Sequence, residues 1–433
     1  MKNQRLIYLA IPLLLTLLVS NLLDFTSSTS RVNQSYPAVV CPPNTDGLTT
    51  AISLTSAKTA ARKTGAQSLR TSPVGFSRYA VAAQSAVIEA ENVTPLVWQV
   101  RSGVWAGAMG CSAPSSSQWF VGGTADITSK GSLHLVNSGL GRALVEVSLF
   151  SENGAISPRT FTIKANSYIS MKLATLDPGS KKIAIHVLTR SGRVNAFVVD
   201  ERGKGLASLG GDLVNPISAA AKVVSIPGIP QQVGKKGPSP HTLRLFVPGN
   251  IDARISAEIR STDGSFAPVG INGRAIAHKK VVEIPMDIQM AAGTFALHIK
   301  SDQPILAAVF SPTKVKKKKD FIWSTPAAEL TQFTLATSGV TPKLVFTGKN
   351  VRLDLTLLYS STKSRRVTIT GEDIATFDVP DGVRGVTFSR ISRGTSGAAL
   401  IAAKSGYGYL PLNAGSVLTN SSVPRSNIRV LNP

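Results

Sequence analysis

Residues 253–264 read ARISAEIRSTDG, and this segment carries the pattern that decides the fold. Apolar residues at 253, 255, 257 and 259 alternate with polar ones, which is typical of a half-buried β-strand. The Asp263-Gly264 pair that follows supplies the positive φ angles of a tight hairpin turn. The segment therefore predicts a hairpin strand with one buried face and one face in water.

The same plan recurs along the chain at a spacing of about 100 residues, which is the size of a small sandwich domain. Apolar strands follow the hairpin at 281–284, 295–299 and 305–310, and equivalent runs precede it at 169–173, 183–187 and 194–199. The chain is therefore predicted to be all-β, with tandem immunoglobulin-like β-sandwich repeats behind an N-terminal membrane helix.

The repeats set the expected domain boundaries. These are an anchor or signal at 1–24, a flexible tether at 25–36, a diverged sandwich at 37–117, sandwiches at 118–204, 222–313 and 320–417, and a tail at 418–433. The runs 119–122 (WFVG) and 321–324 (FIWS) are each expected to start a new repeat. The glycine-rich segment 205–216 is expected to be a loop.

The N-terminal segment is expected to place the chain in a membrane. Eighteen residues, Leu6 to Leu23, carry no charged side chain, and as a helix they would reach about 27 Å, enough to cross a bilayer core. Lys2 and Arg5 precede this run and favour a cytoplasmic N-terminus. We expect a single-pass plasma-membrane protein with its C-terminal region extracytoplasmic. The alternative is a cleaved signal peptide and a secreted protein.

Composition points to an anionic partner. The chain has 47 Lys and Arg against 24 Asp and Glu, which gives a formal net charge of +23. Such a surface attracts acidic polymers or phospholipid headgroups. Because the bulk of the chain is expected outside the cytoplasm, nucleic acid is not expected as a physiological partner.

The two cysteines, Cys41 and Cys111, are expected to form a disulfide. They are the only cysteines in the chain, and exported proteins meet oxidising conditions in which two thiols tend to pair. Two buried free thiols are the alternative. A metal site is not expected, because two cysteines fall short of the usual four ligands.

The most distinctive polar feature is the run KVKKKK at 314–319. Its ammonium groups repel one another and must be solvated or neutralised by anions. It is either a charged linker between the third and fourth repeats or a contact for phosphate-rich wall polymer or lipid headgroups. In the second case the binding residues are Lys314, Lys316, Lys317, Lys318, Lys319 and Trp323. The four tryptophans could stack on sugars, but core packing is the favoured interpretation.

No catalytic constellation is convincing, and the chain is expected not to be an enzyme. Lys63-Thr64-Gly65 and the Ser311-to-Lys314 motif occur in the reverse of the order used by cell-wall transpeptidases, and the latter contains a proline. The five histidines are scattered and are expected to be core or sheet-face residues. No cofactor is expected.

Several short motifs resemble one family. They are Cys41-Pro42, the segment 111–123 (CSAPSSSQWFVGG), the strand 133–137 (LHLVN) and the segment 320–326 (DFIWSTP). Together with the apolar N-terminus, they resemble an actinobacterial envelope family of unknown function, domain-of-unknown-function family 5719. The resemblance implies β-sandwich domains held at the cell surface, and it supplies no reaction, cofactor or catalytic residue.

Two functions are expected from these observations. The first is a non-catalytic, membrane-tethered scaffold or adhesion protein of the bacterial cell envelope, with other envelope proteins as further candidate partners. The alternative is a binding module for an anionic or carbohydrate polymer of the cell wall.

Overall fold

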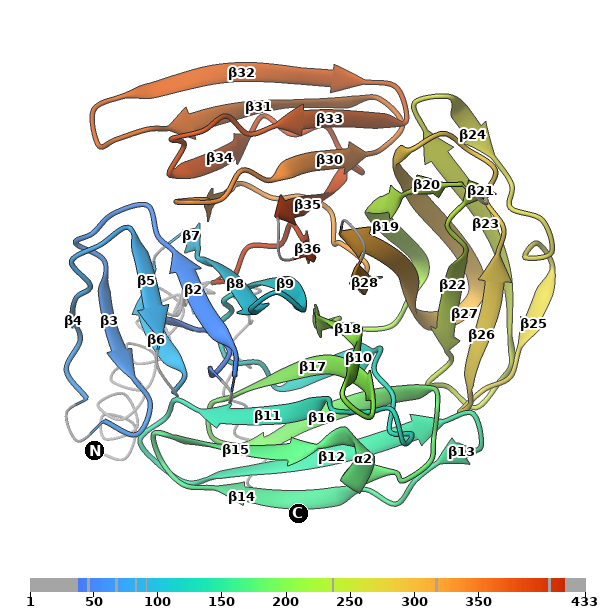
Figure 1. The fold of residues 1–433 in the computed structure, drawn as a ribbon, viewed down its shortest axis with the longest axis horizontal. Helices are drawn as coiled ribbons and strands as arrows, with labels where there is room; N and C mark the ends of the chain where they lie inside the picture. Colours follow the sequence, from blue (N-terminus) through green and yellow to red (C-terminus); the bar gives the residue numbers. More distant parts are fainter. Residues whose placement is uncertain are drawn as a thin grey trace, which may run out of the picture. The chain divides into compact units, whose positions relative to one another are not determined.

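The computed structural model describes residues 38–44, 47–66, 69–81, 84–90, 92–235, 237–315, 318–403 and 406–416. The regular secondary structure of these residues is almost entirely β-strand (Figure 1), and their one helix, α2 (Leu173–Leu176), is a single turn. No helix in this part of the chain is long and apolar enough to cross a membrane. The predicted anchor, tether and tail at 1–24, 25–36 and 418–433 lie outside the described residues.

The strands form four successive groups of two sheets each, here called the first to fourth sandwiches. In the first sandwich, one sheet has the strand order β1 (Ala38–Val40), β6 (Ala86–Glu89), β3 (Ala60–Lys63), β4 (Ser72–Pro73). The other sheet has the order β5 (Arg78–Val81), β2 (Thr49–Ser53), β8 (Leu96–Arg101), β9 (Trp105–Gly110). In the second sandwich, one sheet has the order β10 (Ser117–Val121), β16 (Ile183–Ser191), β12 (Ala143–Ser151), β13 (Gly154–Ala155), and β14 (Arg159–Ile163) also pairs with β12. The other sheet has the order β15 (Ser167–Lys172), β11 (Ser132–Asn137), β17 (Val194–Lys204), β18 (Ala207–Val214).

The third sandwich shares one long strand, β27 (Gly293–Val315), between its two sheets. Its other strands are β19 (Ala221–Gln231), β23 (Ala253–Ser261), β24 (Gly264–Phe266) and β25 (Arg274–Ile276) on one side, and β26 (Val281–Met286), β22 (His241–Phe246) and β28 (Lys318–Ser324) on the other. A separate small hairpin joins β20 (Val233–Gly234) to β21 (Gly237–Pro238). In the fourth sandwich, one sheet has the order β32 (Ser364–Gly371), β31 (Val351–Leu358), β34 (Gly385–Ser389), β29 (Phe333–Ala336). The other sheet has the order β33 (Ile374–Asp378), β30 (Lys343–Thr347), β35 (Ser396–Ala403), β36 (Gly406–Pro411).

The alternation that predicted the fold is confirmed in β23. Ala253, Ile255 and Ile259 are buried, whereas Arg254 lies on the exposed face. The turn also falls where the Asp-Gly pair placed it, since β23 and β24 pair from Ser261 to Gly264, and Gly264 has a φ of 112°. The prediction of an all-β chain is therefore correct.

The sequence expectation is wrong about two strands. Residues 207–214, expected in a loop, form β18, and 321–324, expected to start the fourth repeat, belong to β28, which pairs with β27 of the third sandwich. Both strands close a sandwich. Their sequences are rich in glycine or continuously apolar, so they lack the period of two by which strands are recognised.

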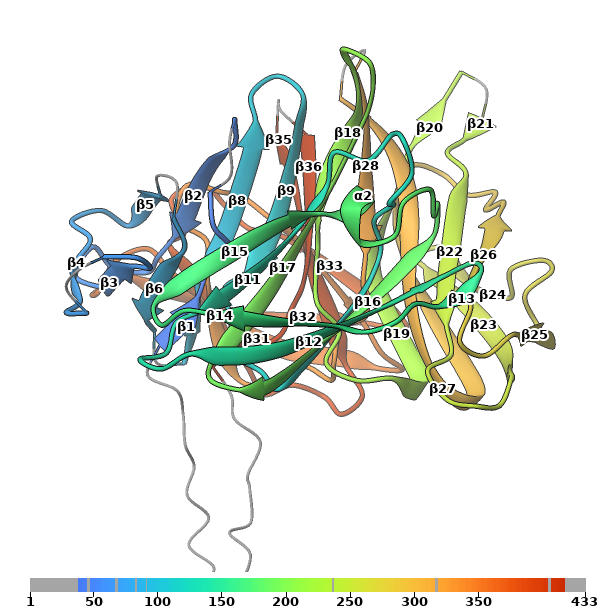
Figure 2. The ribbon, with the colours of Figure 1, turned by 90° about the horizontal axis from the view of Figure 1, so that it is seen from below.

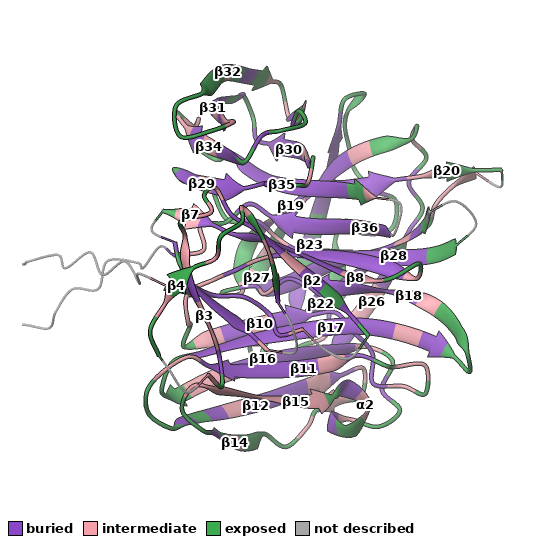
Figure 3. Cartoon of the chain, turned by 60° about the vertical axis from the view of Figure 1, so that its left-hand side comes forward, coloured by how far each residue is buried: buried purple, intermediate pink, exposed green. Residues whose placement is uncertain are grey.

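These closing strands, β9, β18, β28 and β36, meet one another and are here called the hub. Each contacts two others, in the cyclic order β9, β18, β28, β36 (Figure 1). Glycines make the approach possible: a Cβ at Gly211 would lie 2.6 Å from the Trp105 ring, and one at Gly408 would lie 2.5 Å from the Trp98 ring. The hub strands are buried along much of their length (Figure 3), unlike the outer β14 and β32.

Hydrogen bonds also join the first sandwich to the fourth. β7 (Val93–Thr94) adds to the edge of the fourth sandwich by pairing in parallel with β29, and the Ser53 hydroxyl donates to the Ser338 carbonyl at 2.7 Å. Arg244 of the third sandwich donates to the Gly123 carbonyl of the second at 2.6 Å. The compact unit 36–417 is therefore closed on itself.

The two ends of the hub strands differ. The hairpins β8–β9, β17–β18, β27–β28 and β35–β36 turn at the same end, here called the tip end (Figure 2). The opposite or base end holds the predicted disulfide, which is confirmed: Cys41 and Cys111 are bonded and fully buried.

Candidate functional site

The lysine run connects two strands of one sandwich. Val315 pairs with Lys318, and Lys314 pairs with Lys319, across the β27–β28 hairpin. The interpretation of the run as a linker between the third and fourth repeats is therefore wrong. Lys316 and Lys317 lie outside the described residues.

Other hairpins bring more positive charge to the same end. We define the tip face by its exposed lysines, namely Lys130, Lys204, Lys235, Lys314, Lys318 and Lys319. The Lys318 ammonium donates to the carbonyl of Gly103 at the β8–β9 turn, and that of Lys130 donates to Gly205 at the β17–β18 turn at 3.2 Å. The second and third sandwiches thus supply the lysines of one basic surface, and the first sandwich contacts it at Gly103.

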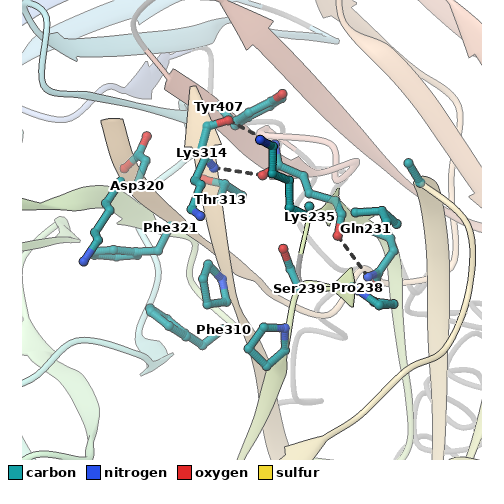
Figure 4. Close-up of a pocket in the computed structure, with 18 of the residues that line it drawn as sticks. Gln231, Lys235, Pro238, Ser239, Phe310, Thr313, Lys314, Asp320, Phe321 and Tyr407 are labelled. Carbon is teal, nitrogen blue, oxygen red and sulfur yellow. Dashed lines mark hydrogen bonds between the residues drawn. The ribbon is translucent and has the colours of Figure 1, made fainter. Parts of the chain in front are cut away.

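A cleft of about 1000 Å³ opens on this face, between the β20–β21 hairpin and the β27–β28 hairpin (Figure 4). Gln232 ties the two walls together, because its side chain accepts from Lys314 N at 2.8 Å and donates to Lys314 O at 3.2 Å. Phe310 and Phe321 line the cleft, together with Lys235. Thr313 also lines it; its hydroxyl is buried and lacks a hydrogen-bond partner among the described residues.

Trp323 does not belong to this face, although the sequence grouped it with the lysines. Its side chain is fully buried, its indole N–H donates to Asp200 at 2.8 Å, and the Arg244 guanidinium lies 4.6 Å from its ring centroid. A ligand cannot stack on it, so its assignment as a binding residue is wrong. Trp98 and Trp105 are likewise buried, as expected for core residues.

The hub contains carboxylates that the sequence analysis missed. Burial raises the pKa of Asp320 to about 7, against the opposing effect of backbone amides that include those of Gly211, Ala106 and Tyr407. These amides come from β18, β9 and β36, so one carboxyl group lies near backbone amides of every other hub strand. The Gly211 amide lies 3.1 Å from Asp320 Oδ1.

Asp212 is a second buried carboxyl group in the hub. It accepts from the backbone amide of Trp323 at 2.7 Å and from that of Leu213 at 2.8 Å. Burial raises its pKa well above the usual value. The only sequence signal for such a group is an acid within an otherwise apolar strand, as in the LGGDLV of β18.

The third sandwich contains a hydrogen-bonded serine–histidine pair, an arrangement that can support nucleophilic chemistry. Ser311 Oγ lies 2.8 Å from His241 Nδ1, and His241 Nε2 lies 2.6 Å from Gln231 Oε1. Both Ser311 and His241 are buried, and burial lowers the pKa of His241 to about 4. A substrate could not reach this buried serine. The chain of hydrogen bonds instead has a structural role, because it joins β27, β22 and β19.

The histidines were predicted to be core or sheet-face residues rather than metal ligands. His134, expected in a strand, is buried in β11, and burial lowers its pKa to about 4. Among the residues that the structure describes, no three His, Cys, Asp or Glu side chains are grouped so that they could hold a metal ion.

Comparison with known proteins supports the resemblance noted in the sequence. Residues 77–380, more than half of the chain, match the model of a family described as a family of unknown function (DUF5719). No curated protein matches the chain. The match runs from the first sandwich into the fourth and includes β18 and β28 of the hub. The chain therefore belongs to the family of unknown function DUF5719.

Proposed function

We propose that the protein is a non-catalytic scaffold of the bacterial cell envelope whose tip face binds an anionic partner. In this proposal residues 1–24 tether it to the plasma membrane of an actinobacterium, and the four sandwiches lie outside the cytoplasm. The observation that carries the proposal is the convergence of lysines from the second and third sandwiches at one end of a closed hub.

The charges of the tip face are available to a ligand. Among the described residues, its six lysines form no ion pair, and all are exposed. Like charges on neighbouring hairpins add their potentials over about 8 Å at physiological salt. Phosphate groups spaced along a polymer or a lipid surface would neutralise several of them at once.

The scaffold part of the proposal is supported by the hub. Neighbouring sandwiches contact through β9, β18, β28 and β36, so the hairpin tips are held in fixed positions relative to each other. We also propose that the sandwiches have immunoglobulin-like topology and that other envelope proteins bind to this scaffold. Carbohydrate binding by tryptophan stacking gains no support, because Trp98, Trp105 and Trp323 are buried and the half-buried Trp119 ring is stacked on His186.

The test is binding of the full chain to labelled inorganic polyphosphate, followed by fluorescence anisotropy over a salt titration. The tip variant is Lys314→Gln with Lys318→Gln and Lys319→Gln. The matched control, Lys279→Gln with Lys280→Gln and Lys349→Gln, removes the same charge from exposed lysines in base-end loops.

We expect the tip variant to bind polyphosphate about tenfold more weakly at low salt and to show a flatter salt dependence, since it loses three phosphate contacts. The control should retain most of the affinity of the parent. Equal loss in both variants would mean that net charge alone matters, and unchanged binding in the tip variant would overturn the proposed binding face.

A further inference from the structure

Two aliphatic side chains are fully exposed at the tip end. Ile127 is 99% exposed and Leu206 is 106% exposed. Leu206 stands in the two-residue turn between β17 and β18, where Lys204 pairs with Ala207, and Gly205 adopts the positive φ of 58° that this turn needs.

Ile127 and Leu206 lie on segments that are bonded to each other. The Gly203 amide donates to the Thr128 carbonyl at 2.8 Å, next to Ile127, and Lys130 reaches Gly205 O, next to Leu206. The two exposed side chains therefore extend from one tip that also carries Lys130 and Lys204. A third aliphatic residue, Val233, is half exposed beside Lys235 on the β20–β21 hairpin.

This combination separates two kinds of anionic partner. A soluble polyphosphate chain offers negative charge but no apolar phase, so exposed aliphatic groups would add nothing to its binding. An anionic bilayer offers both, since apolar side chains can enter the boundary of the acyl region while lysines stay among the phosphates. Lysine stems can extend along the apolar groups and keep their ammonium heads in water.

We infer that the tip face docks on an anionic lipid bilayer, with Ile127 and Leu206 entering the bilayer interface. This inference rests on the anionic partner proposed above. The six lysines of the tip face then contact lipid phosphates around the inserted pair. Insertion of each aliphatic side chain strengthens membrane partition by about one order of magnitude when it is fully buried, and by less at the interface.

The experiment uses the full chain in phosphatidylcholine nanodiscs and measures its cosedimentation with vesicles of phosphatidylglycerol and phosphatidylcholine. The test variant is Ile127→Ser with Leu206→Ser. The matched control is Leu140→Ser with Ile251→Ser, which removes two exposed aliphatic side chains from base-end loops. Polyphosphate binding and thermal unfolding of every variant are measured in parallel.

We expect the test variant to bind the vesicles about tenfold more weakly, with polyphosphate binding within about twofold of the parent. The control should match the parent in both assays. Unchanged vesicle binding by the test variant would overturn the inference while leaving polyphosphate binding to support the proposed function. Binding of the parent to polyphosphate but not to vesicles would identify a soluble polyanion as the partner and would also overturn it.

A second readout follows the inserted side chain itself. Both native cysteines are joined in the disulfide, so Leu206→Cys provides a single thiol for an environment-sensitive fluorophore. We expect the emission of this fluorophore to shift to shorter wavelength with anionic vesicles and to be quenched by brominated lipid acyl chains. No quenching, or a shift that depends on protein concentration without vesicles, would instead indicate a site outside the bilayer or self-association, and either would contradict the inference.

Discussion

The hub and the tip face are made by the same hairpins, yet their chemistry is opposite. In β28 the change takes one residue: Lys318 and Lys319 are exposed, whereas Asp320 is 4% exposed and Phe321 is buried. The hub uses small residues and buried carboxyl groups, while the tip face uses solvated ammonium groups. The comparison indicates that stability depends on the hub and that ligand binding depends on the tips.

Enlarging a hub glycine is the change expected to have the largest effect. In Gly408→Val the new Cβ would lie 2.5 Å from the Trp98 ring and 2.8 Å from the Ala108 amide nitrogen. Overpacking against backbone should cost about 3 kcal/mol of unfolding free energy or more. Chemical denaturation measures it. Gly249→Val is the control, since a Cβ there meets no atom within 4 Å, and an equal loss in both would contradict close packing at the hub.

Asp320 should make the stability of the hub depend on pH. Burial raises its folded pKa from 3.8 to about 7, so the folded protein holds the proton more tightly than the unfolded chain. Its stabilising contribution is therefore present below about pH 4 and is lost as the pH rises to about 7.

The comparison with Asp320→Asn isolates this effect from other titrating groups, including His134 and His241, whose lowered pKa values act in the opposite direction. The unfolding free energy of the parent minus that of the variant should fall by about 3 kcal/mol over this range. Denaturation at a series of pH values measures it. A constant difference would show that Asp320 titrates normally.

Replacing Trp323 should affect the hub and spare the tip face. Trp323→Phe keeps an aromatic ring but leaves Asp200 without the indole donor that lies 2.8 Å away. Loss of a buried hydrogen bond to a charged group should cost about 2 kcal/mol of unfolding free energy. Polyphosphate affinity should stay the same in anisotropy measurements, and a weakened affinity in a stably folded variant would return Trp323 to the binding site.

The tip lysines should have the smallest effect on stability. Lys314→Gln with Lys318→Gln and Lys319→Gln removes charges that are exposed and form no described ion pair. Exposed substitutions of this kind move the unfolding free energy by about 0.5 kcal/mol or less. Chemical denaturation alongside the binding assay checks this, and a loss comparable to that of Gly408→Val would remove the distinction between the two regions.

The sequence predicted those parts of the molecule that follow from local patterns. Alternation identified strands such as β23, and the expectation of export, together with the presence of only two cysteines, identified the pair Cys41 and Cys111. The hub was missed because its glycine-rich strands pack on partners that are distant in the sequence, as Gly211 does on Trp105. Trp323 was misassigned because four residues of strand cover about 13 Å, which is enough to pass from the exposed tip into the core.

Differential scanning calorimetry of the full chain tests most directly whether the hub makes the four sandwiches one cooperative unit. The calorimetric enthalpy should equal the van't Hoff enthalpy in a single transition, because the hub strands of all four sandwiches lose their partners together. Separate transitions, or a calorimetric enthalpy several times the van't Hoff value, would show that the sandwiches unfold independently and would contradict this cooperativity.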